Sequence, residues 1–103
     1  MTLLLDVEGY LEQLDDWSQE AASELAALES IRLTASHWEL ITLVRSYYQK
    51  FDHSPSMRPL VKWIKQEAGL QNGNSIYLHT LFPVSPAKQL AKIAGLPKPR
   101  KCL

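Results

Sequence analysis

The side chain best suited to chemistry is the single cysteine of this 103-residue chain, Cys102. Three cationic residues stand close before it, Lys98, Arg100 and Lys101, with no acidic residue among them. Nearby positive charge favours the thiolate, the nucleophilic form of cysteine, although the terminal carboxylate of Leu103 opposes this effect. We therefore take Cys102 as the candidate catalytic residue, acting by thiol exchange. The alternative is that a lone cysteine near a terminus is incidental.

Other residue types that commonly build active sites form no recognisable pattern. The three histidines, His37, His53 and His79, fall on different predicted elements, and there is no second cysteine to join them. Such spacing does not predict a metal site. The chain also lacks a nucleophile-elbow motif and a glycine-rich phosphate loop. We expect neither a metal nor a cofactor.

A proline-stiffened arm is predicted to present Cys102. Gly95 is the expected stop of the preceding helix and the expected hinge of the arm. Pro97 and Pro99 fix φ and push the residues before them towards extended geometry. We expect residues 96–103 to be a flexible arm rather than packed structure, so that deleting them would cost little thermal stability. The residues expected to contact a partner are Gly95, Leu96, Pro97, Lys98, Pro99, Arg100 and Lys101.

Hydrophobic periodicity predicts a compact, mostly α-helical bundle in residues 1–95. Apolar residues recur three or four positions apart in successive segments, and capping residues, prolines and glycines mark their ends. The N-terminal segment, Thr2 to Val7, is compatible with a short strand or an ordered arm. The predicted helices are Gln19–Glu29, Ala35–Phe51, Ser56–Ala68, a short helix between Asn74 and Phe82, and Pro86–Ala94.

Two arginines, Arg45 and Arg58, stand close to predicted apolar faces. Each is expected to lay its aliphatic stem along the apolar surface and keep its charge in water. Contact with the C-terminal arm is the alternative for both.

The charges are segregated along the chain although the formal net charge is zero. Residues 1–30 contain eight acidic residues and no Lys or Arg. This asymmetry is typical of a basic surface for nucleic acid or an acidic partner, or simply of two solvated faces. The helices 35–51 and 56–68 could also form a helix-turn-helix, with Lys62 and Lys65 on the exposed side of the recognition helix.

Length and composition indicate one small domain in a reducing compartment. A chain of this size can bury a modest core, and one cysteine excludes an intramolecular disulfide. The first residues, M-T-L-L-L-D-V-E, carry no basic start and only a short apolar run. We expect a cytoplasmic protein with no membrane anchor.

Several segments closely resemble the DsrC/TusE family of sulfur-relay proteins. The most specific is A-G-L-P-K-P followed, after two intervening residues, by a penultimate cysteine, and the resemblance extends over nearly the whole chain from Glu8 onward. This resemblance argues against an incidental role for Cys102. The other matching segments are Leu33–Ile41, Ser54–Lys62, Gly73–Leu78 and Leu81–Pro83.

The resemblance implies a carrier whose Cys102 accepts a sulfane sulfur as a persulfide. In the DsrC branch a second cysteine lies eleven positions earlier, where this chain has Ala91, so the chain looks like the TusE branch. By that resemblance Cys102 would take sulfur from a TusBCD-like complex and hand it to an MnmA-like tRNA thiouridylase. Contact with tRNA would be indirect. A DsrC-like accessory or regulator of sulfite reduction is the alternative within the family.

The N-terminus departs from the family pattern. Family members usually begin with two short strands, followed by a Gly-Tyr-Leu sequence that is matched here by Gly9-Tyr10-Leu11. This chain reaches that sequence after only eight residues. The first strand is therefore expected to be shortened or absent.

Overall fold

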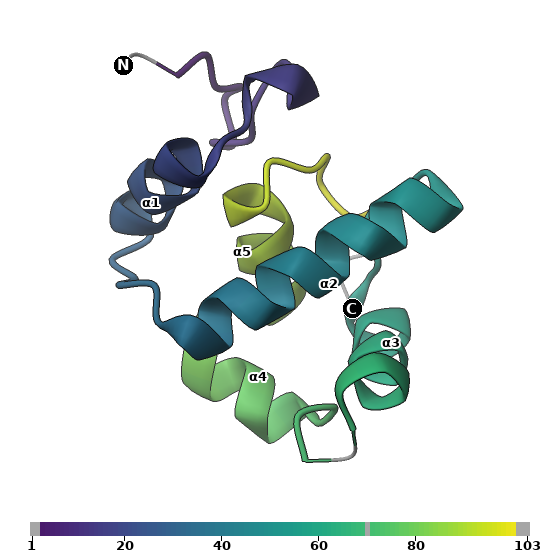
Figure 1. Ribbon diagram of the computed structural model, residues 1–103. Coiled ribbons are helices and arrows are strands. Elements are labelled where there is room, and N and C mark those ends of the chain that lie inside the picture. The colour runs from purple at the N-terminus through teal and green to yellow at the C-terminus, as the bar shows by residue number, and fades with distance from the viewer. Residues whose placement is uncertain (1–2, 70, 101–103) are drawn as a thin grey trace.

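The computed structural model of this chain describes residues 3–69 and 71–100. Within these ranges the chain forms five α-helices after a short 3-10 turn, as Figure 1 shows. The predicted mostly helical bundle is confirmed, and each helix lies within one residue of its predicted ends. The elements are η1 (Leu14–Asp16), α1 (Gln19–Leu28), α2 (Ala35–Phe51), α3 (Met57–Ala68), α4 (Ser75–Leu81) and α5 (Pro86–Ile93).

Side-chain caps begin two of the helices where the sequence predicts them. The Ser18 hydroxyl accepts a hydrogen bond from the Ala21 amide at the start of α1. The Asn74 carboxamide oxygen accepts one from the Tyr77 amide at the start of α4. These bonds satisfy amides that have no partner within the helix, so short helices can begin at defined residues.

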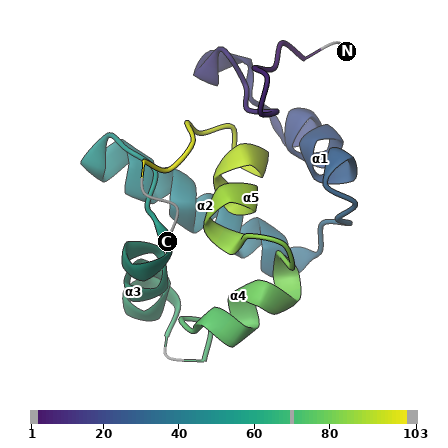
Figure 2. The ribbon, with the colours of Figure 1, turned by 180° about the vertical axis from the view of Figure 1, so that it is seen from behind.

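The short helix α5 lies at the centre of the bundle and contacts each of the other four helices. Figures 1 and 2 show it between α1 on one side and α3 on the other. Its residues Leu90, Ala91 and Ile93 have no exposed surface. The segment that follows α5 therefore starts from the interior of the molecule.

The N-terminal region forms an ordered turn instead of a developed strand. Leu5 and Leu11 make an isolated antiparallel bridge, and no longer strand occurs in residues 3–69 or 71–100. The Asp6 carboxylate accepts hydrogen bonds from the amides of Glu8 and Tyr10 and so stabilises the turn. The expected β element is reduced to this bridge, because one pair of short strands is marginal by itself.

Candidate functional site

The helix before Cys102 ends in a left-handed cap at Gly95. Gly95 has φ +74, and its amide donates to the Lys92 carbonyl at 3.1 Å. The Leu96 amide donates to the Ala91 carbonyl at 2.9 Å, which completes a Schellman motif. A Cβ atom added at Gly95 would lie 2.3 Å from the Trp17 ring. Gly95 is confirmed as the helix stop, whereas its role as a hinge stays a prediction.

Side chains from three distant segments bind the backbone carbonyls around Gly95. The Trp17 indole Nε1 donates to the Ile93 carbonyl at 2.9 Å. The Arg45 guanidinium donates to the Ala94 carbonyl at 2.6 Å, and the Ser54 hydroxyl donates to the Pro97 carbonyl at 2.5 Å. The backbone at the end of α5 and just beyond it is therefore held by side chains from three other parts of the molecule.

Arg45 is the charged member of this group. Its guanidinium carbon stacks 3.8 Å from the centre of the Trp17 ring. Burial lowers the pKa of Arg45 from its ordinary value, and the carbonyl bond and the ring offset that loss of solvation. Arg45 therefore contacts the end of α5, just before the C-terminal arm, whereas its contact with the arm itself stays a prediction.

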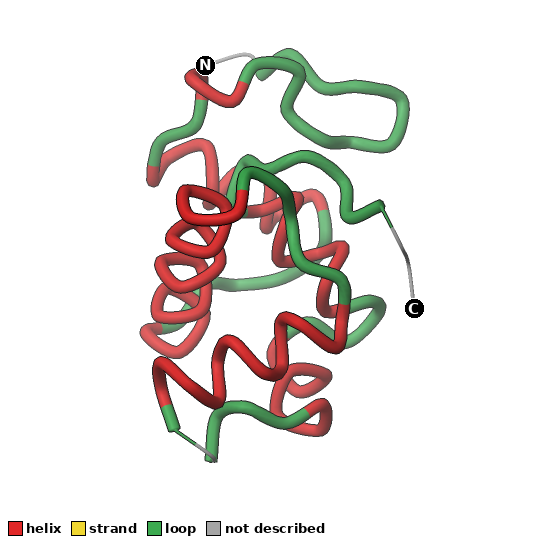
Figure 3. Tube along the Cα trace, turned by 90° about the vertical axis from the view of Figure 1, so that its right-hand side faces the viewer, coloured by secondary structure: helices red, strands yellow, loops and turns green. Residues whose placement is uncertain are grey.

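The segment 96–100 is packed against the body of the molecule, although Figure 3 shows no regular secondary structure in it. Leu96 is 3% exposed, and Pro99 is fully buried. Lys98 makes a 2.7 Å ion pair with Glu8. The expectation of an arm without packing is wrong for Leu96 and Pro99, because extended geometry does not prevent burial. The division of the chain at residue 95 stays a prediction.

Replacing Leu96 with alanine tests this packing. Leu96→Ala is expected to lower the free energy of unfolding by about 2–5 kcal/mol, since it leaves a cavity in the core. The matched control is Leu28→Ala, because Leu28 is 67% exposed in α1 and should lose less than about 0.5 kcal/mol. Urea unfolding measures both. Equal losses in the two variants would show that residue 96 is not packed in solution.

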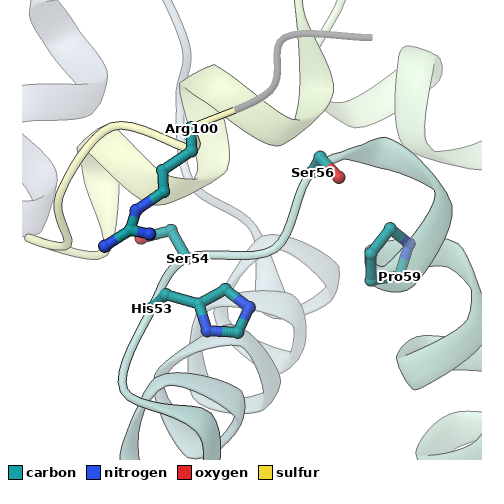
Figure 4. A pocket seen from close by; sticks show the side chains of 5 residues that line it. All are labelled: His53, Ser54, Ser56, Pro59 and Arg100. Carbon is teal, nitrogen blue, oxygen red and sulfur yellow. The ribbon is translucent and has the colours of Figure 1, made fainter.

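A pocket of about 240 Å³ lies where the described C-terminal segment meets the turn between α2 and α3. Figure 4 shows the Arg100 side chain extending towards Ser54 and His53, with Ser56 and Pro59 on the α3 side. The Ser54 hydroxyl already donates to the Pro97 carbonyl, and His53 Nδ1 lies 2.9 Å from the Phe51 carbonyl. The Arg100 guanidinium and the Ser56 hydroxyl are therefore the groups of this pocket that suit an acidic side chain or another small anion.

Cys102 itself lies outside the described residues, as does Lys101. The structure therefore describes the predicted site residues from Gly95 to Arg100, of which Arg100 lines the pocket. Of those residues, Gly95, Leu96 and Pro99 are buried, whereas Pro97, Lys98 and Arg100 are exposed.

The histidines have separate surroundings, as the sequence predicts. His37 is buried: its Nδ1 accepts from the Thr34 amide, so its Nε2 carries the proton and donates to the Leu81 carbonyl. His53 lines the pocket, and His79 bonds to the Ser75 carbonyl. No cluster of three potential metal ligands occurs within residues 3–69 and 71–100.

Sequence reasoning missed Trp17 as a residue that binds the end of α5 and Ser54 as a residue that binds the C-terminal segment. Both bonds join positions more than forty residues apart, so no local pattern indicates them.

None of the helices in the described part of the chain is long and apolar enough to span a membrane.

Comparison with known proteins identifies relatives over almost the full chain. Residues 1–103 match the family model described as DsrC like protein. The sulfurtransferase TusE of Buchnera aphidicola subsp. Schizaphis graminum is 54% identical over 98 residues, which cover 95% of this chain and 86% of that protein. The sulfurtransferase TusE of Yersinia pseudotuberculosis is 53% identical over the same length, covering 91% of that protein.

A solved structure agrees with these sequence relatives. The NMR structure of Allochromatium vinosum DsrC has a TM-score of 0.88 and 42% identity to this chain, and the match covers 98% of this chain and 90% of that one. A match of this length includes the helices and the segment that follows α5. The chain therefore belongs to the DsrC-like family.

Proposed function

We propose that this protein is a sulfur carrier that accepts a sulfane sulfur as a persulfide on Cys102 and passes it to a tRNA 2-thiouridylase for wobble-uridine 2-thiolation. The observation that carries the proposal is the sole cysteine of the chain, together with 54% identity over 98 residues to a protein named sulfurtransferase TusE. The protein acts as a sulfurtransferase-type carrier rather than as a stand-alone enzyme.

The transfer step needs no external oxidant. The Cys102 thiolate attacks the outer sulfur of a donor persulfide, forming a new S–S bond while the S–S bond of the donor breaks. The donor cysteine leaves as a thiolate with the electron pair, and the sulfane sulfur keeps its proton. The acceptor cysteine repeats this exchange on the outer sulfur of Cys102. Positive charge near Cys102 stabilises the thiolate both as nucleophile and as leaving group.

The packed segment before Cys102 supports the exchange by limiting disorder. Leu96 and Pro99 are buried, so binding a partner need not order the whole of residues 96–103. Less conformational entropy is then lost when Cys102 enters the active site of a partner. We infer that the donor is a TusBCD-like complex and the acceptor an MnmA-like enzyme, that tRNA is contacted only through the acceptor, and that the exchange takes place in the cytoplasm.

A role in sulfite reduction is the second candidate function. It is favoured by the likeness to the oxidized gamma-subunit of the dissimilatory sulfite reductase (DsrC) from Archaeoglobus fulgidus, with a TM-score of 0.83 and 40% identity, covering 98% of this chain and 92% of that one. By the family resemblance, that branch uses a second cysteine where this chain has the buried Ala91. A single cysteine cannot form an intramolecular disulfide, so the carrier function fits this chain better.

Reconstituted tRNA thiolation tests the proposal. A cysteine desulfurase with cysteine, the donor complex, the thiouridylase and tRNA are combined with and without this protein, and 2-thiouridine is measured by nucleoside mass spectrometry. We expect 2-thiouridine formation to depend on the protein. Equal formation in its absence would contradict a role in this relay.

A further inference from the structure

The segment before Cys102 offers few backbone donors of its own. Pro97 and Pro99 have no amide hydrogen, so two of the five residues in segment 96–100 cannot donate a backbone hydrogen bond. The carbonyls of the segment are therefore best held by donors from elsewhere in the chain. Ser54 supplies one: its hydroxyl donates to the Pro97 carbonyl at 2.5 Å, across 43 residues of sequence.

Ser54 stands in a turn whose backbone is closely fixed. Helix α2 ends at Asp52, which has φ +60 and whose amide donates to the Tyr48 carbonyl at 2.7 Å. Pro55 is fully buried and favours extended backbone at Ser54, the residue before it. Ser54 itself is 5% exposed. Its hydroxyl therefore has a defined place, and so does the carbonyl that it holds.

The Ser54 hydroxyl is not used to begin the next helix. The N-cap of α3 is Ser56, and no side-chain cap bond is made there. An alanine at position 54 would fill the same space apart from one oxygen atom, so packing does not require the hydroxyl. Its contact with the segment before Cys102 is the better explanation for a buried hydroxyl at this position.

A weaker contact holds the same segment from the N-terminal turn. The Glu8 carboxylate accepts a hydrogen bond from the Lys98 ammonium at 2.7 Å, and more than a third of each side chain is exposed. Water and salt screen such a pair, so we expect it to contribute less than the Ser54 bond. Both anchoring side chains, Ser54 and Glu8, can be changed without altering the sequence of the C-terminal arm.

The buried Pro99 limits where Cys102 can go. Cys102 follows Pro99 by three residues and Gly95 by seven. At about 3.6 Å per residue, its reach is about 11 Å from Pro99 and about 25 Å from Gly95. Effective concentration falls roughly as the −3/2 power of tether length, so an arm free from Gly95 onward would present the thiol to a partner about fourfold less often.

We propose that Ser54 is a positioning residue for sulfur transfer, which holds the Pro97 carbonyl so that Cys102 is presented from a seated segment. Glu8 assists through Lys98. This inference rests on the proposed function. The segment stays seated during the exchange, so the donor cysteine must approach the turn between α2 and α3.

The test measures sulfur transfer from a loaded TusBCD-like complex over a series of concentrations of this protein. Ser54→Ala is expected to raise KM about threefold to fivefold and leave kcat unchanged, because the thiol is presented less often but reacts as before. The matched control is Ser46→Ala, since the Ser46 hydroxyl also donates to a carbonyl, that of Leu43, but within α2. Glu8→Gln should raise KM less than Ser54→Ala does, and Glu24→Gln, at an exposed position in α1, should not raise it.

Two further measurements separate positioning from reactivity and from folding. Alkylation by iodoacetamide reports on the sole cysteine, and its rate in Ser54→Ala should stay within about twofold of wild type, because a positioning residue leaves the thiolate unchanged. A six-residue Gly-Ser insertion between Arg100 and Lys101 leaves every described contact in place and lengthens the tether from three to nine residues. It should raise KM about fivefold.

Unchanged KM in Ser54→Ala or in the insertion variant would overturn the inference. Faster transfer by Ser54→Ala would also overturn it, by showing that the seated segment withholds Cys102. Slower alkylation of that variant would assign Ser54 to thiol reactivity instead. Each of these results is compatible with sulfur loading of the wild-type protein. Absence of that loading, with a loaded donor, would instead reject the proposed function and the inference with it.

Discussion

Cys102→Ser is expected to reduce 2-thiouridine formation in the reconstituted relay to the level seen without the protein. A serine hydroxyl is not ionised at neutral pH and cannot hold a sulfane sulfur. The substitution exchanges a single atom, the γ sulfur for oxygen, so the shape of the side chain changes little. The melting temperature should stay within about 1 °C, because every stabilising contact described above is made by residues up to Arg100 and single substitutions away from such contacts have small effects.

The control for this substitution is Cys102→Ala, which removes the polar atom and should lose activity equally. Nucleoside mass spectrometry measures thiolation, and thermal unfolding followed by circular dichroism measures stability. Activity retained by either variant would show that Cys102 is not the carrier of sulfur. Loss of activity together with a large fall in melting temperature would show instead that residue 102 supports the fold.

Gly95→Ala is expected to lower the free energy of unfolding by about 2–5 kcal/mol. One part of the loss comes from the left-handed backbone at φ +74, which disfavours a Cβ atom. The other part is steric, since the new Cβ would meet the Trp17 ring, which is itself held by its bond to the Ile93 carbonyl. At about 4–8 °C per kcal/mol for a domain of this size, the melting temperature should fall by at least about 8 °C.

Gly69→Ala separates the two contributions. Gly69 also has positive φ, at +94, but among residues 3–69 and 71–100 no atom beyond its chain neighbours lies within 4 Å of its added Cβ, so only a backbone cost is expected there. A double-mutant cycle with Trp17→Leu should reveal a favourable coupling at Gly95 and none at Gly69, because a smaller side chain relieves the clash. Equal effects at the two glycines, with no coupling to residue 17, would contradict the close approach of Trp17.

The helices could be predicted from the sequence because their signals are local. Ser18 and Asn74 begin α1 and α4 as hydroxyl and carboxamide caps should, and Gly95 ends α5 in the left-handed conformation that glycine favours. Cys102 was identifiable as the candidate site because its residue type and cationic neighbours are also local. The family resemblance could also be found from the sequence, because contiguous motifs carry it.

The packing of the C-terminal segment could not be predicted in the same way. Pro97 and Pro99 indicate extended geometry, but the same geometry suits a free arm and a segment laid against a core. The choice depends on residues such as Ser54, which is distant in sequence and meets the segment only in the folded chain. The central place of α5 is likewise a property of the tertiary structure, since its length and periodicity are ordinary.

A persulfide on Cys102 can be detected by intact-mass analysis of the protein after incubation with a cysteine desulfurase, cysteine and a TusBCD-like complex. We expect a gain of one sulfur atom that reductant removes and that Cys102→Ser lacks. No gain on wild-type protein, with the donor complex shown to be loaded under the same conditions, would contradict a persulfide on Cys102.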